Sequence, residues 1–212
     1  MIRQFSALRR TTPPAAEPVT TEELRRHARI AGEEADLAWL ITTARERVEA
    51  ASGRALINQT WTMTIDDWPS GDADWWETLH HLVHEDQVWL ELPPSPLAAV
   101  PNVTVTTYDN ADAPTVITVN DYWYVDTASE PGRLVLRSGE SWPVDERPGA
   151  MGVITYVCGY GATGASVPAE LRHAVLLLAA WMYEHRGDES AGDPLVLSGA
   201  LACLAGRKVW TL

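Results

Sequence analysis

The segment VEAASGRALINQTWTMTI (Val48–Ile65) decides the fold, because its hydrophobic period changes partway along. Up to Gly53, which is suited to end a helix, apolar residues recur every three or four positions and form one helical stripe. This stripe consists of Leu37, Leu40, Ile41, Ala44, Val48 and Ala51. From Thr60 to Ile65, polar and apolar residues alternate, which is typical of a strand with one buried face. The chain therefore passes from a helical part into a β part.

Upstream of this segment, the sequence predicts a first helix that begins at Thr20. Thr20 and Glu23 have the spacing of a capping box, and Val19 and Leu24 that of a hydrophobic staple. We expect this helix to run to about residue 31 and a second, longer helix to cover roughly residues 34–52.

Downstream, many short strand-like runs are separated by turn signals such as Asp109-Asn110 and Glu130-Pro-Gly132. This pattern indicates a compact antiparallel sheet or a small barrel. Besides residues 60–65, the runs are Val88–Leu92, Val103–Tyr108, Thr115–Val119, Tyr122–Val125, Arg133–Leu136 and Val153–Val157.

Helical signals return after Val167-Pro168, with an apolar stripe from Leu171 to Met182, and Asp193-Pro194 opens a short last helix. We therefore predict an α+β fold in which an α-helical bundle, two N-terminal and two C-terminal helices, is interrupted by a small antiparallel β-domain. The expected parts are an extended N-terminal arm (1–19), a helical pair (20–55), an acidic β-rich domain (56–158), C-terminal helices completing the bundle (166–206) and a C-terminal tail (207–212).

Charge is distributed very unevenly along the chain. The net charge is −13, and the stretch from Ala55 to Gly132 holds thirteen Asp and Glu residues and neither Lys nor Arg. Such a stretch repels polyanions. It is therefore no nucleic-acid-binding patch, but it suits a surface that DNA passes without adhering.

Catalytic and metal-binding patterns are weak. His80 and His84 have the i, i+4 spacing of zinc ligands on a helix, but His81 stands where a zincin has its Glu, and Glu85 lies outside that pattern. The segment Gly159–Gly164 lacks the spacing of a phosphate-binding loop and is interpreted as a flexible strand-to-helix link. We predict no enzyme, no cofactor and no metal.

Only two cysteines, no signal-peptide pattern and no apolar run of membrane-spanning length occur in the sequence. These features predict a reducing compartment and no membrane contact.

The sequence resembles the head–tail connector (adaptor) proteins of long-tailed bacteriophages and gene transfer agents, over about residues 16–205. The resemblance rests on the order in which several segments follow one another along the chain. The segments that carry the resemblance are Glu17–Leu24, Arg45–Trp61, Leu92–Leu97, Ser129–Arg133, Ser141–Pro143, Val157–Gly161 and Val167–Ala174. The chain departs from the family pattern in its first ten residues and in the Asp72–Glu85 insert.

The resemblance implies a non-enzymatic subunit of a ring, expected to be a dodecamer, at the head–tail interface of a particle assembled in the bacterial cytoplasm. Its expected partners are further copies of itself, the portal protein and a tail-side stopper or tail terminator. DNA would pass through the ring's channel without specific binding.

Both ends of the chain combine cations with large apolar residues, as a partner-binding arm does. We expect the C-terminal tail to dock on the portal through Arg207, Lys208, Val209, Trp210 and Leu212. Subunit or partner contacts are expected at Phe5, Leu8, Trp75 and Trp76.

Two alternatives remain open from the residues. A β-module that binds carbohydrate or a receptor would use Trp75, Trp76 and Trp89 as stacking platforms, and a metal-dependent hydrolase would use His80, His81, His84 and Glu85.

Overall fold

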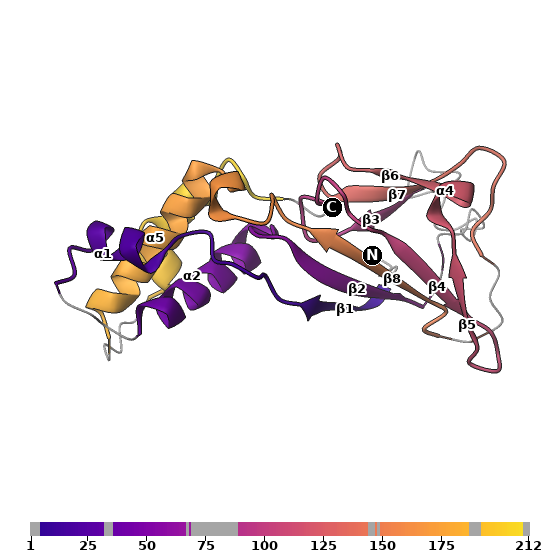
Figure 1. Ribbon diagram of the computed structural model, residues 1–212, viewed down its shortest axis with the longest axis horizontal. Helices are drawn as coiled ribbons and strands as arrows, with labels where there is room; N and C mark the ends of the chain where they lie inside the picture. Colours follow the sequence, from indigo (N-terminus) through magenta and orange to yellow (C-terminus); the bar gives the residue numbers. More distant parts are fainter. Residues whose placement is uncertain are drawn as a thin grey trace.

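The computed structural model describes residues 5–31, 36–66, 68, 89–143, 147, 149–186 and 192–209. The molecule is elongated, with the helices gathered at one end and the strands at the other (Figure 1). The α+β fold class is thereby confirmed, and so is the interruption of a helical bundle by antiparallel strands.

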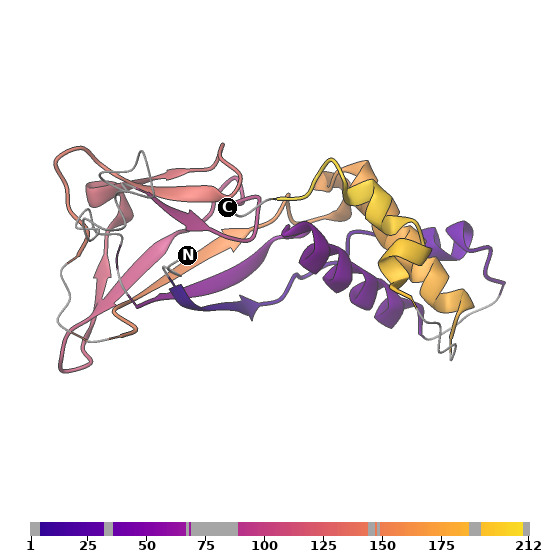
Figure 2. The same cartoon turned by 180° about the vertical axis from the view of Figure 1, so that it is seen from behind.

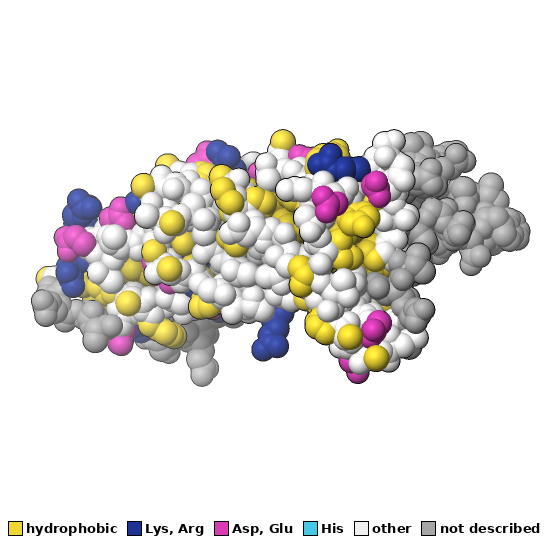
Figure 3. Space-filling model, turned by 45° about the vertical axis from the view of Figure 1, so that its right-hand side comes forward, with side chains coloured by type: hydrophobic (Ala, Val, Ile, Leu, Met, Phe, Trp, Pro, Cys, Tyr) yellow, Lys and Arg dark blue, Asp and Glu magenta, His cyan; other side chains and the backbone are white. Residues whose placement is uncertain are grey.

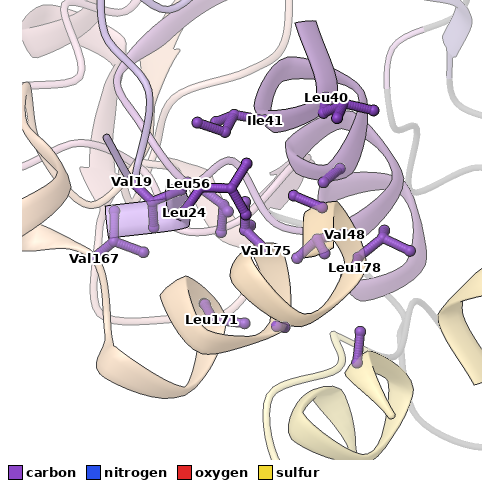
Figure 4. Close-up of a cluster of buried hydrophobic side chains, with 14 of the residues drawn as sticks. Val19, Leu24, Leu40, Ile41, Val48, Leu56, Val167, Leu171, Val175 and Leu178 are labelled. Atoms are coloured by element: carbon purple, nitrogen blue, oxygen red, sulfur yellow. The ribbon is translucent and has the colours of Figure 1, made fainter. Parts of the chain in front are cut away.

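Helices from the two ends of the chain form the bundle. They are α1 (Thr21–His27), α2 (Leu37–Ser52), α5 (Ala169–Glu184), α6 (Pro194–Leu197) and α7 (Ala200–Leu204). The predicted stripes of α2 and α5 face each other in one core, and Figure 4 shows Val48 of α2 beside Val175 and Leu178 of α5. Burying such a side chain contributes about 1.5–3 kcal/mol, so this contact holds the two sequence-distant halves together.

Local signals set the ends of the helices. Thr20 and Glu23 form the predicted capping box, and Val19 and Leu24 are buried together in the bundle core. The predicted single last helix is instead two short helices, because Gly199 has a left-handed φ of 78° that breaks the helical path between them. The α1 helix ends at His27, earlier than predicted.

The strands form two antiparallel sheets rather than one sheet or a barrel. The five-stranded sheet has the order β1 (Phe5–Thr12), β2 (Gln59–Ile65), β8 (Gly152–Cys158), β4 (Thr104–Tyr108), β5 (Pro114–Ile117). The three-stranded sheet has the order β3 (Trp89–Leu92), β7 (Gly132–Leu136), β6 (Trp123–Asp126). A single helical turn, α4 (Val119–Tyr122), which the sequence did not predict, precedes β6.

The two sheets share one hydrophobic core. Met63 and Ile154 from the larger sheet and Leu90 and Leu134 from the smaller one are fully buried in it. Trp123 is also fully buried, and its ring forms a three-membered cluster with those of Trp68 and Trp142, in which the centroid distances are 6.5 Å (Trp68–Trp123), 5.9 Å (Trp123–Trp142) and 5.5 Å (Trp68–Trp142). Aromatic residues therefore fill the β core, as their enrichment in small β-domains suggests.

Part of the predicted N-terminal arm belongs to the β-domain. Within residues 1–19, Phe5–Thr12 forms strand β1 and pairs along β2, with Leu8 opposite Met63 and Arg10 opposite Trp61. The proline-rich residues that follow connect this strand to α1. The signal for β1 is weak in sequence because its three apolar residues, Phe5, Ala7 and Leu8, do not alternate strictly with polar ones and are followed by two arginines, as in an arm.

Candidate functional site at the domain junction

The chain passes between the bundle and the β-domain at several points, and these connections lie together (Figures 1 and 2). Helix α2 ends at Ser52 and β2 starts at Gln59, while β8 ends at Cys158 and α5 starts at Ala169. The C-terminal residues leave α7 and run back towards the strands, as the yellow segment in Figure 2 shows. We call this region the junction.

Arg54 is the centre of a polar cluster at the junction. Its Nη1 and Nη2 donate to Glu130 Oε1 and Oε2 at 3.0 and 2.5 Å, and Nη1 also donates to the Tyr160 hydroxyl at 2.8 Å. Its Nε donates to the carbonyl oxygen of Arg207. These hydrogen bonds hold the pKa of Glu130 below its ordinary value. One side chain thus links the end of α2, the β6–β7 turn, the segment after β8 and the tail.

Glu49 forms a second cluster one turn before the end of α2. Its carboxylate accepts hydrogen bonds from Arg45 Nη1 at 2.8 Å, Gln59 Nε2 at 2.9 Å and the Leu56 backbone N–H at 2.9 Å. Arg45 is itself buried and donates through Nε to Glu17 at 2.8 Å. Burial raises the pKa of Glu49, although all three donors favour its ionised form. The cluster fixes the first strand residues against the helix.

The start of the C-terminal tail is attached to the junction. The Val209 N–H donates to the Ser52 carbonyl oxygen at 3.0 Å, and Arg207 Nε donates to Glu170 Oε2 at 3.0 Å. Together with the bond from Arg54 to the Arg207 carbonyl, these contacts hold Arg207–Val209 on the subunit itself. Part of the tail predicted to dock on the portal is therefore structured within its own chain.

Beside the tail, the junction contains a cleft with a volume of about 740 Å³. Its lining comes from β1, from Trp61 of β2 and from the last turn of α2. Pro93, Pro94, Pro131 and Val209 add further apolar side chains to the lining. The cleft therefore lies where segments that carry the resemblance, such as Arg45–Trp61 and Leu92–Leu97, meet.

The sequence-predicted interface residues fall in different places. Leu8 is half-buried, packs on the β core and lines the cleft, while Phe5 pairs with Ile65 through its backbone. Lys208 lies at the cleft wall. The other predicted residues lie outside the described part of the chain: Trp75, Trp76, Trp210, Leu212, His80, His81, His84 and Glu85.

Trp89, the remaining residue of the alternative carbohydrate site, is half-buried in β3. The Arg133 guanidinium lies over its ring, 5.1 Å from the centroid. A sugar that stacked on this face would have to displace the cation.

The acidic stretch is less one-sided in space than in sequence. Three of its carboxylates face arginines from outside the stretch: Glu130 with Arg54, Glu91 with Arg133 at 3.9 Å and Asp112 with Arg147 at 3.4 Å. Asp109 and Asp126 accept backbone N–H groups in turns. On the face in Figure 3, acidic side chains are scattered singly among apolar and polar ones. The described β-domain is therefore only moderately acidic.

The described residues offer little chemistry. Burial raises the pKa of the Cys158 thiol far above its ordinary value, which makes it unreactive at neutral pH. Among the same residues, no group of three or more His, Cys, Asp or Glu side chains is placed to hold a metal ion. None of their helices is long and apolar enough to cross a membrane.

The glycine-rich segment after β8 is close-packed, contrary to the flexible link predicted from the sequence. Gly159 has φ of 137°, and a Cβ there would lie 2.6 Å from the Asn58 backbone nitrogen. At Gly164 a Cβ would collide with the Pro18 carbonyl oxygen. These glycines allow the backbones of the junction to approach one another.

Sequence reasoning missed the junction as a site, although its residues occur in the quoted motifs. Arg54 lies in the segment Arg45–Trp61, Glu130 in Ser129–Arg133 and Tyr160 in Val157–Gly161. The position of Arg54 in the sequence could have pointed to the junction, because Arg54 is the last cation before the acidic stretch.

Comparison with solved structures shows the same fold over nearly the whole chain. Three similar chains each align with 98% of this chain, and the alignments include 97%, 97% and 98% of the length of those chains. They come from the neck of an empty gene transfer agent (GTA) particle computed with C6 symmetry (24% identity, TM-score 0.74), the virion of a native GTA particle (22%, 0.71) and the neck of a native GTA particle computed with C12 symmetry (24%, 0.71). No protein-family model matches the chain, and no curated protein matches it significantly in sequence.

Proposed function

We propose that this chain is a structural, non-enzymatic head–tail connector (adaptor) subunit in the neck of a phage or gene transfer agent particle. The observation that carries the proposal is the end-to-end fold similarity, at TM-scores of 0.71–0.74, to chains of GTA particles. Similarity over 98% of the chain includes both domains and the junction between them, and not only a common β-sandwich.

The proposed assembly is a ring of identical subunits, a dodecamer. Two of the similar chains belong to necks computed with C6 and C12 symmetry, which supports cyclic self-association. In a cyclic ring each subunit presents two different surfaces to its two neighbours. The elongated shape suits a subunit that contacts neighbours along its length (Figure 1).

The ring would lie between the portal and a tail-side stopper or tail terminator and would extend the DNA channel. An acidic wall would keep the phosphate backbone from adhering. The net charge of −13 per subunit supports this role. Arg54 and Arg133, which flank the acidic stretch in sequence, are paired with its carboxylates Glu130 and Glu91 and would be less available to hold DNA.

Portal docking is assigned to the C-terminal tail, with Lys208, Trp210 and Leu212 as the contacting side chains. Arg207 and Val209 would hold the base of the tail on its own subunit, as their bonds to Glu170 and Ser52 indicate. A short, anchored, apolar-plus-basic segment loses less conformational entropy on binding than a free arm.

The test is negative-stain microscopy of the purified protein, alone and with its portal. We expect twelve-fold rings that stack coaxially on the portal. A protein that stays monomeric in both samples would refute the proposal. Trp210→Ala with Leu212→Ala should abolish stacking on the portal without preventing rings, whereas Thr211→Ala is the matched control.

A further inference from the structure

We propose that the cleft at the junction binds the segment Trp210–Leu212 of the same chain, so that each free subunit stores its own docking tail. This inference deepens the proposed function, and only its last step, release to the portal, rests on that function. The cleft has a volume of about 740 Å³, which is large enough for a short peptide with one aromatic residue.

The position of Val209 supports this occupant. Val209 lines the cleft and is held there by its N–H bond to Ser52, with its Cβ 3.6 Å from the place a Gly53 Cβ would take. Three residues beyond it reach at most roughly 10 Å when fully extended. The three residues that follow Val209 are therefore long enough to enter the cleft and too short to reach a distant surface of the subunit.

The lining matches the chemistry of this segment. Leu8, Ala50, Trp61, Pro93 and Pro94 form apolar walls from both domains. Aromatic and branched aliphatic side chains such as those of Trp210 and Leu212 gain most from burial in such a site. Proline and aromatic walls also lose little side-chain entropy on binding, since they are already rigid.

The tail is expected to bind the cleft of its own subunit, and not that of a neighbour, because of its high effective concentration there. A segment joined to the cleft wall by a fixed residue experiences a local concentration in the millimolar range or above, which exceeds that of a neighbouring subunit's tail in dilute solution. Storage would cover the apolar side chains of the tail until the portal offers a competing surface. The tail would then exchange between its own cleft and the portal.

A disulfide test uses exposed positions, so that the fold is preserved. Ala50→Cys places a thiol at an exposed position of α2 that lines the cleft, and Thr211→Cys places one in the tail while keeping Trp210 and Leu212. Both are introduced with Cys203→Ser, because Cys203 is only half-buried. The control pairs Thr211→Cys with Ala38→Cys, which is also exposed but lies about 18 Å away along α2.

The monomer that is not assembled into a ring is oxidised mildly. For the variant with Ala50→Cys and Thr211→Cys, we expect an intramolecular disulfide at a yield at least about tenfold above that of the control. Mass spectrometry of non-reduced peptides identifies the linked pair. Equal yields in the two variants would overturn the proposal. So would a disulfide-linked dimer as the main product, because it would place the tail in another subunit's cleft.

A second measurement separates the cleft from the portal function. Adding portal before oxidation should lower the intramolecular yield by at least about fivefold, since both sites compete for one segment. An unchanged yield with portal bound would overturn the exchange. If the disulfide is absent while Trp210→Ala with Leu212→Ala still abolishes portal binding, the cleft proposal fails and the connector proposal stands.

Discussion

Arg54 and Glu130 form a two-point ion pair across the junction, with N–O distances of 3.0 and 2.5 Å between residues 76 positions apart in sequence. The Arg54 side chain is only 7% exposed, whereas that of Glu130 is 47% exposed. The buried Arg54 guanidinium therefore needs a partner for its charge. The Glu130 carboxylate is the member of the pair whose titration can be followed as the pH is lowered.

We expect Arg54→Ala to lower the free energy of unfolding by about 2–3 kcal/mol, because it removes hydrogen bonds from a buried charge to three segments. Urea denaturation followed by circular dichroism measures the change. Arg25→Ala, which removes an i, i+3 pair with Glu22 at 3.2 Å, is the control and should change stability by less than about 0.5 kcal/mol. Equal effects of the two changes would contradict the role assigned to Arg54.

Glu130→Gln should make stability less dependent on pH. Its pKa is lowered in the folded protein, so the ionised carboxylate stabilises the fold above the ordinary value of 4.5. This contribution is lost as the pH falls through the lowered pKa. The difference in unfolding free energy between wild type and variant should be full at neutral pH and shrink in acid. Glu91→Gln controls for loss of one charge, and a difference that stays constant down to pH of about 3 would be inconsistent with the pairing.

Gly159→Ala should destabilise the protein by at least about 2 kcal/mol, because it combines a φ of 137° with a clash against backbone. Gly206→Ala is the matched change, since a Cβ at Gly206 meets nothing within 4 Å. Thermal unfolding of both variants measures the contrast. If Gly159→Ala were as stable as wild type, the segment after β8 would not be closely packed.

Trp123→Ala should cost about 3–5 kcal/mol by leaving a cavity between the two sheets. Trp123 is fully buried in the stack with Trp68 and Trp142, whereas Trp39 on α2 is 64% exposed. Trp39→Ala therefore deletes the same side chain without a cavity and should leave subunit stability nearly unchanged. Chemical denaturation distinguishes the two, and comparable losses would mean that the stack is not a core.

The helices were predictable because their signals are local. The Thr20–Glu23 capping box and the spacing of Leu171, Val175 and Leu178 depend on residues three or four apart, and the structure confirms both. The strands other than β1 were recognised for the same reason, although their grouping into two sheets was not. Pairing of β1 with β2 joins residues that no local pattern relates.

Local patterns of residues were enough to predict the fold class, the change of hydrophobic period at Gly53 and the excess of acidic residues in the middle of the chain. The meeting of Arg54 with Glu130, Tyr160 and Arg207, and the start of the tail beside a cleft, became visible only in the folded chain. The physical reason is that periodicity and caps act between near neighbours. A junction depends on how two separately formed cores approach one another, which the packing of the whole chain fixes.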